Sequence, residues 1–309
     1  MPFTRGRYGK CDHSIENVIA GQAQGTFVTF YFSNKCPFPI WPAIAANVGR
    51  PAIADGGFPL PSGNVKRILV PFSWTGRFWA RTGCDFTSNR KPACETGDCD
   101  GRLACNGTIG LPPATLVQVS AQADRTKPNF YDVSLVDGYN LPVSVTARTL
   151  EPKCFIGGCS KDIKSICPNE LKVLNDVGQA MACKSACLAF DLDQFCCRNS
   201  YGSPSKCKPS VYSKIFKDAC PSYFSYAFDS PLPLVSCTAN EYIVTFCPSK
   251  RVLPCPLRYV DYSPTCAALQ AISSFNQIET YYMKSQCTSH FSLGLFTLLF
   301  FQFYSINLT

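Results

Sequence analysis

Residues 130–145 have the sequence FYDVSLVDGYNLPVSV, which is typical of two β-strands separated by a turn. Apolar and polar side chains alternate on both sides of Asp137-Gly138, as expected for an extended chain with one buried face. The dipeptide Asp137-Gly138 is itself a signal for a hairpin turn. One face of the first predicted strand carries Tyr131, Val133 and Leu135, and the other face carries Asp132, Ser134 and Val136.

Strand signals recur along the middle of the chain. Segments that are β-branched and aromatic, or that alternate in polarity, lie at 26–32, 116–120 and 242–246. Two stretches, Val177–Phe190 and Tyr212–Ala219, are instead compatible with helices. We therefore expect an all-β fold over residues 26–248, with short helices confined to a cysteine-rich region at about 159–220.

Cysteine is the most informative residue type in this chain of 309 residues. The chain has 20 cysteines, and those outside the terminal segments are Cys36, Cys84, Cys94, Cys99, Cys105, Cys154, Cys159, Cys167, Cys183, Cys187, Cys196, Cys197, Cys207, Cys220, Cys237 and Cys247. An even, dense set is typical of an oxidised extracellular protein stabilised by disulfides. Zinc binding is the alternative, but residues 26–248 contain no histidine, and structural zinc sites usually combine Cys with His or cluster four cysteines. We therefore expect disulfides and no metal.

The two ends differ from this middle block. Residues 1–25 lack the apolar stretch of a secretory signal peptide, so we expect that the signal is missing from this sequence or that export is unconventional. Residues 249–309 form a C-terminal extension whose apolar part, SLGLFTLLFFQFY at 292–304, is shorter than the ~20 residues of a membrane span. It also lacks the polar spacer of a lipid-anchor signal, so anchoring is disfavoured. Four further cysteines lie in these ends, and their pairing is open: Cys11, Cys255, Cys266 and Cys287.

Several other chemistries are disfavoured by the composition. The net charge of +8 is not gathered into basic runs interleaved with aromatics, which argues against nucleic-acid binding. No phosphate-binding or dinucleotide-binding glycine motif occurs, and we expect no cofactor. The histidines His13 and His290 both lie in the ends, away from any predicted catalytic group. Asn106-Gly107-Thr108 is an acceptor sequence for N-glycosylation, so Asn106 should carry a glycan if the chain is secreted.

A series of segments then identifies a family. These segments are TFVTFYFSNKCPFPIWPA (26–43), SWTGRFWARTGCDF (73–86), CETGDCDGRLACNG (94–107), LPPATLVQ (111–118), FYDVSLVDGYNLPVSV (130–145), CPNEL (167–171), CKSACLAF (183–190), YSKIFKDACPSYFSYAFD (212–229) and YIVTFCPS (242–249). In this order and with sixteen cysteines, the block resembles the thaumatin-like proteins, a pathogenesis-related group best known from plants. The resemblance covers nearly all of residues 26–248.

The resemblance implies a β-sandwich core with two attached lobes. A small loop lobe would lie at about 82–109, and a disulfide-rich lobe with short helices at about 159–220. The resemblance also implies eight disulfides: Cys36–Cys247, Cys84–Cys94, Cys99–Cys105, Cys154–Cys237, Cys159–Cys220, Cys167–Cys183, Cys187–Cys196 and Cys197–Cys207.

The family also has a cleft lined by one arginine and four acidic residues. Mapped onto this sequence, these positions are Arg77, Gln118, Asp132, Asp137 and Asp229. Gln118 departs from the family, which has glutamate there. Judged without the resemblance, Asp132 would be a solvated strand residue, Asp137 the first residue of its turn, Asp229 a loop residue and Arg77 a surface residue.

The resemblance implies a defence protein that acts on fungi. We expect it to bind β-1,3-glucan or another cell-wall polysaccharide through this cleft as a monomer in the apoplast, and to act on pathogen membranes as a further expectation. A weak endo-β-1,3-glucanase using Asp132 and Asp137 is one alternative, but the Gln118 amide cannot protonate a leaving group. A module that binds or inhibits another protein is the second alternative.

Overall fold

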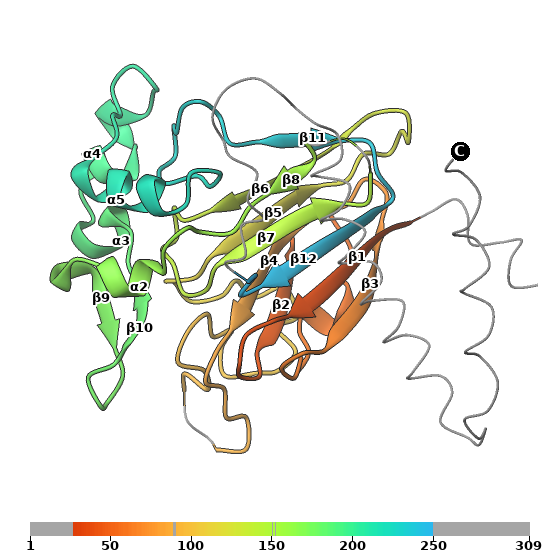
Figure 1. Cartoon of the computed structure of the whole chain (residues 1–309), viewed down its shortest axis with the longest axis horizontal. Helices are drawn as coiled ribbons and strands as arrows, with labels where there is room; N and C mark the ends of the chain where they lie inside the picture. The colour runs from red at the N-terminus through yellow and green to blue at the C-terminus, as the bar shows by residue number, and fades with distance from the viewer. Residues whose placement is uncertain (1–26, 89–90, 150, 152, 250–309) are drawn as a thin grey trace, which may run out of the picture.

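The computed structural model describes residues 27–88, 91–149, 151 and 153–249. Two five-stranded sheets form the centre of the fold (Figure 1). The first sheet has the order β3 (Val65–Pro71), β1 (Phe27–Asn34), β12 (Glu241–Phe246), β7 (Val143–Ala147) and β8 (Phe155–Ile156). The second has the order β11 (Val235–Cys237), β6 (Asn129–Ser134), β5 (Leu116–Ser120), β4 (Thr75–Arg81) and β2 (Trp41–Ala46). The fold is the expected all-β class.

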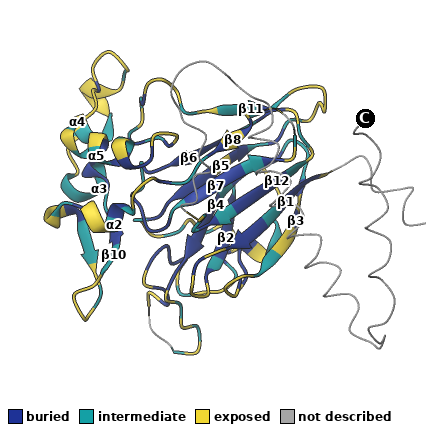
Figure 2. Ribbon diagram, viewed as in Figure 1, coloured by how far each residue is buried: buried dark blue, intermediate teal, exposed yellow. Residues whose placement is uncertain are grey.

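The two sheets enclose an aromatic core. The ring of Phe78 on β4 lies 5.2 Å from that of Phe30 and 5.0 Å from that of Phe32, both on β1 of the other sheet. Tyr131 on β6 and Tyr242 on β12 make a similar edge-on contact at 5.4 Å. Figure 2 shows the inner strands in dark blue, and these aromatic side chains are almost completely buried. Burial of such large rings stabilises the sandwich through both area and edge-to-face geometry.

Disulfides tie the sandwich and its lobes together. The first and last strands, β1 and β12, are parallel neighbours, and Cys36–Cys247 links the residues that follow them. The bridges in the described residues are the eight pairs that the resemblance implies. A bridge that closes a loop of about 200 residues contributes roughly 5 kcal/mol in the chain-entropy account. Cys11, Cys255, Cys266 and Cys287 lie outside the described residues, as do His13, His290 and the apolar C-terminal segment.

The helical lobe lies at one end of the sandwich (Figure 1). Its elements are α2 (Ile163–Ile166), β9 (Lys172–Leu174), β10 (Ala180–Cys183), α3 (Ala186–Phe190), α4 (Asp193–Cys196) and α5 (Val211–Ala219). Single 3-10 turns occur at Ala54–Gly56, Asn169–Leu171 and Asn199–Tyr201. The predicted helix at Tyr212–Ala219 is confirmed as α5, which begins at a capping box between Ser210 and Ser213.

Two predictions of local structure were wrong. The stretch Val177–Phe190 is helical only from Ala186, because residues Ala180–Cys183 instead pair with β9 as β10. Asp137-Gly138 does form a turn, in which the Gly138 N–H donates to the Leu135 carbonyl at 2.9 Å. That turn is not a hairpin, however, because β6 and β7 belong to different sheets and the chain crosses from one layer to the other.

None of the helices within the described ranges has the length and apolar character that crossing a membrane requires.

Candidate functional site

The outer face of the second sheet carries the cleft residues on three neighbouring strands. Arg77 on β4 lies opposite Gln118 on β5, and Gln118 lies opposite Asp132 on β6. Directly opposed residues on adjacent strands have Cβ atoms about 5 Å apart, so the three side chains form one row across the sheet. Alternation along β5 sets this register, because Val117 and Val119 point into the core and leave Gln118 exposed on the outer face.

A groove with a cavity volume of about 300 Å³ lies over this row. We call it the outer groove, and its lining is Asn47, Thr75, Gly76, Arg77, Gln118, Val119, Ser120, Phe130, Asp132 and Leu234. Thr75, Ser120 and Phe130 form a second row in register beside the first. None of these three residues was among the predicted site residues. The signal for this second row was the two-residue spacing that places Ser120 on the face of Gln118, and Phe130 on the face of Asp132.

Asp132 is the buried acid of the groove. Its side chain is 6% exposed, and its Oδ1 is buried without a hydrogen-bond partner among the described residues. Burial disfavours the charged form and raises the pKa of Asp132 to about 7. The carboxyl is therefore protonated in a large fraction of molecules at neutral pH, which weakens the acidity of the groove.

Asp137 lies at the turn after β6 and is only half-buried. Its carbonyl accepts from the Ala114 N–H at 3.0 Å, which anchors the turn beside the loop before β5. Burial raises the pKa of Asp137, and the positive charge of Arg77 opposes that shift. Arg77 and Asp137 thus interact electrostatically, although Asp137 does not line the outer groove.

Asp229 does not line the outer groove, and its carboxylate is engaged by neighbouring side chains and backbone. Its Oδ2 accepts hydrogen bonds from the N–H and hydroxyl of Ser225, at 2.8 and 2.9 Å, and pairs with the Lys217 ammonium at 3.1 Å. The Asp229 side chain is 4% exposed, and the pair ties α5 to the loop that follows it. The structure therefore brings Arg77, Gln118 and Asp132 together in one row, with Asp137 close enough to Arg77 to interact with it. Asp229 is not part of the groove lining and pairs with Lys217 of α5.

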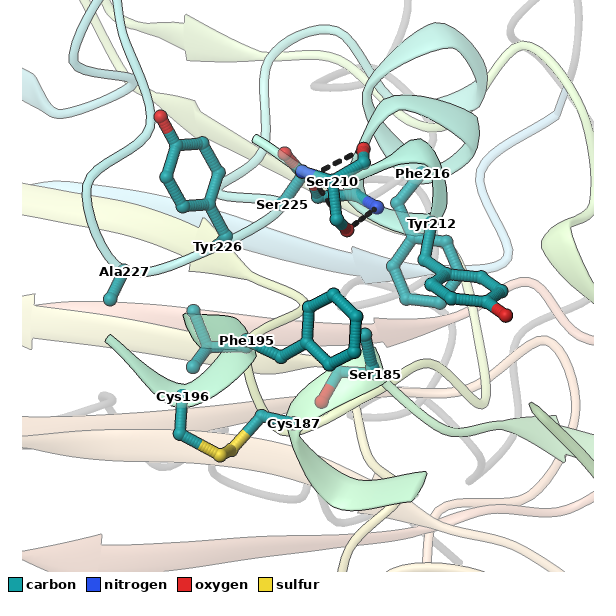
Figure 3. A pocket seen from close by; sticks show the side chains of 13 residues that line it. Ser185, Cys187, Phe195, Cys196, Ser210, Tyr212, Phe216, Ser225, Tyr226 and Ala227 are labelled. Carbon is teal, nitrogen blue, oxygen red and sulfur yellow. Dashed lines mark hydrogen bonds between the residues drawn. A yellow bond between two sulfur atoms is a disulfide. The ribbon is translucent and has the colours of Figure 1, made fainter. Parts of the chain in front are cut away.

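A second, smaller cavity lies inside the helical lobe. Figure 3 shows its walls, which include the Cys187–Cys196 disulfide, Phe195 and Phe216. Tyr212 also lines it but turns its hydroxyl outward, where it donates to Glu170 at 2.9 Å. The volume of about 40 Å³ has room for a few water molecules and not for a sugar ring. The outer groove is therefore the better candidate for a ligand site.

No group of three or more His, Cys, Asp or Glu side chains in the described part of the chain could hold a metal ion.

Comparison with known proteins identifies the family. The model of the Thaumatin family matches residues 34–248. The chain belongs to the thaumatin family. It is 45% identical over 235 residues to a thaumatin-like protein of Arabidopsis thaliana, covering 76% of this chain and 95% of that protein. It is also 45% identical to pathogenesis-related protein 5 of the same plant over 219 residues, covering 71% of this chain and 90% of that protein.

Two further similarities belong to the same family. An osmotin-like protein of Solanum lycopersicum is 45% identical over 218 residues, covering 69% of this chain and 86% of that protein. The solved structure of a thaumatin-like xylanase inhibitor is 20% identical, with a TM-score of 0.38, covering 71% of this chain and 99% of that one. The sequence relatives place this thaumatin-family chain among the pathogenesis-related defence proteins. Together with the eight disulfides of the described residues, they indicate a secreted protein.

Proposed function

We propose that this protein acts in the apoplast as an antifungal defence protein that binds cell-wall β-1,3-glucan in the outer groove. The observation that supports this most is the row of Arg77, Gln118 and Asp132 across three rigid strands, under a groove of about 300 Å³. Small-molecule sites are typically concave, with a few polar groups that set the ligand's orientation.

The two rows of the groove suit a sugar. The half-buried Phe130 ring offers an apolar face for a pyranose, while Thr75 and Ser120 bring hydroxyls beside it. Arg77 and Gln118 add N–H donors, and the Asp132 carboxyl can accept from a sugar hydroxyl. A neutral polysaccharide needs this mixture of donors and acceptors more than it needs net charge.

Binding without hydrolysis is the favoured form of this activity. Glycosidases need two carboxyl groups at about 5–5.5 Å or about 6.5–9.5 Å, on either side of the scissile bond. Between Arg77 and Asp132 the row has the Gln118 amide, which can neither donate a proton to a leaving group nor attack. The pKa of about 7 would suit Asp132 as a general acid, so a weak glucanase with Asp137 as its partner is the second candidate.

A pull-down on insoluble β-1,3-glucan tests the proposal. The full chain, made through a secretory host so that its disulfides form, is compared with an Asp132→Asn/Asp137→Asn double variant. An Asp176→Asn/Asp218→Asn variant is the matched control, because both of those aspartates are exposed and lie in the helical lobe. Reducing sugar is measured in the same tubes. We expect the parent and the control to be retained, the groove variant to be released, and no sugar to appear.

Other outcomes would redirect the assignment. Sugar release by the parent and not by the groove variant would support the glucanase. Equal retention of all three proteins would exclude the groove as the binding site. If none of the three proteins is retained, glucan binding is contradicted and a membrane or protein target is favoured. Binding to anionic vesicles would then support the membrane target, and binding to a defined microbial hydrolase would support the protein target.

A further inference from the structure

Arg77 and Gln118 are adjacent donors that the fold leaves unused. Within the described residues, neither side chain forms a hydrogen bond or a salt bridge. Across the sheet, the other neighbour of Arg77 is Ala45, which brings no carboxylate to it. The Arg77 guanidinium and the Gln118 amide therefore lie side by side at the groove, and neither forms a hydrogen bond with the other residues of their row.

Arg81, on the same strand, differs from Arg77 in its hydrogen bonding. Arg81 is fully buried and donates to the carbonyls of Trp41, Arg102 and Leu103 at 3.0, 2.7 and 2.9 Å. The hydrogen bonds of the Arg81 guanidinium thus hold the loop lobe against the sheet. Arg77 lies four residues earlier on the same face of β4, at the outer groove, and there it makes no hydrogen bond to a carbonyl of the described residues.

Such a pair is suited to a carboxylate. The planar guanidinium matches a carboxylate in a bidentate geometry, and the amide nitrogen of Gln118 can donate a third hydrogen bond. A glutamate at position 118 would instead pair with Arg77 and repel an incoming anion. Asp137 opposes anion binding through its interaction with Arg77, but it lies outside the lining of the groove. In that lining, Arg77 and Asp132 are the charged side chains among the residues described.

We propose that the outer groove selects saccharides that carry a carboxylate, with Arg77 and Gln118 as the pair that binds the uronate group. The inference rests on the proposed function, because Phe130 and the hydroxyls of the second row must hold the sugar ring while Arg77 and Gln118 bind its carboxylate. Gln118 is then a specificity-determining residue, and its amide gives this chain a ligand preference that a glutamate would remove.

A matched pair of ligands tests the inference. Calorimetric titration of the full, disulfide-bonded chain compares laminarihexaose with the same oligosaccharide oxidised at C6, which differs only in its carboxylates. An oligogalacturonide runs beside them to separate β-linked glucuronate from α-linked galacturonate. We expect at least one uronate ligand to bind about tenfold more tightly than laminarihexaose, as expected for a charge-assisted hydrogen-bonded pair.

Substitutions assign the preference to the groove. Gln118→Glu and Arg77→Gln should each remove the tenfold preference, measured as the ratio of the affinities of the same variant for the oxidised and the neutral ligand. Arg67→Gln is the control, because Arg67 is equally a strand arginine but is exposed on β3 of the other sheet. It should keep the full preference.

Each contrary result has a distinct meaning. Equal binding of neutral and oxidised ligands would overturn the inference and leave the proposed function standing. A preference that Arg67→Gln also weakens, or that survives Arg77→Gln, would assign it to the overall positive charge and overturn the inference. If none of the ligands binds, both the inference and the proposed function fail.

Discussion

An Asp132→Asn substitution should change how the stability of this protein depends on pH. Asp132 is 6% exposed, and its Oδ1 has no hydrogen-bond partner among the described residues. Folding therefore moves an ionisable group into a site that disfavours its charge, and the pKa rises from 3.8 to about 7. Asparagine has nearly the same shape and does not ionise, so the difference between the two proteins isolates the ionisation of Asp132.

The expected magnitude follows from the shift. Between pH 3.8 and about 7, the unfolded chain has lost the proton of Asp132 while the folded chain still holds it. The stability contributed by the neutral group is thus fully present below pH 3.8, falls by about 1.4 kcal/mol per pH unit, and is lost above pH 7. Roughly three units give ~4 kcal/mol in total, so the variant should gain this much relative to the parent between pH 3 and pH 8.

Guanidinium denaturation with intact disulfides, repeated from pH 3 to pH 8, measures this difference. Any constant offset between the two proteins reflects the new amide and is ignored, because only the slope against pH reports the ionisation. Asp176→Asn at an exposed turn should run parallel to the parent at every pH. A flat difference curve for Asp132→Asn would show that Asp132 ionises as it does in water, and the account of the groove's weak acidity would then be wrong.

Three further predictions concern the elements around the groove. Arg81→Met removes three part-buried hydrogen bonds to backbone carbonyls and should lower the free energy of unfolding by at least ~3 kcal/mol, with faster proteolysis within 82–109. Arg77→Met on the same strand should change it by less than about 0.5 kcal/mol. Lys217→Met leaves the buried Asp229 carboxylate without its cation and should cost about 3 kcal/mol in urea denaturation, and full stability would show that the pair is replaceable. Asn106→Asp should remove one N-glycan from protein made in a secretory host, seen by mass spectrometry, without altering the melting temperature, because Asn106 is exposed on a turn.

Strands with a clear two-residue alternation could be predicted from the sequence, because burial of one face dominates their pattern. The segment 116–120 is β5 with the predicted bounds, the segment 242–246 is most of β12, and residues 27–32 of the segment predicted at 26–32 belong to β1. The error at Val177–Phe190 has a local cause. Ala180–Cys183 is too short to show a period, and its state depends on pairing with β9 and on the Cys167–Cys183 bridge.

The turn at Asp137-Gly138 shows a different limit. The dipeptide correctly marks a reversal with Gly138 at a φ of 86°, where a Cβ would come within 2.8 Å of the Cys183 carbonyl oxygen. Whether two strands flanking a turn pair with each other depends on partners elsewhere in the chain. Here β6 pairs with β5 and β11, whereas β7 pairs with β12, so the turn links two layers.

The site has the same mixture of local and distant causes. Gln118 can be singled out from the sequence, but its position between Arg77 and Asp132 depends on two strand registers that lie far apart in the chain. Along β5, the outer face changes from Leu116, which is buried with Trp79 beneath the loop lobe, to the exposed Gln118 and the half-buried Ser120. A slip of one residue would turn Val117 and Val119 outward and carry Gln118 into the aromatic core. The burial of those two valines is therefore what holds the uncharged Gln118 amide beside Arg77, and the ligand preference we propose follows from the packing of the opposite face of the same strand.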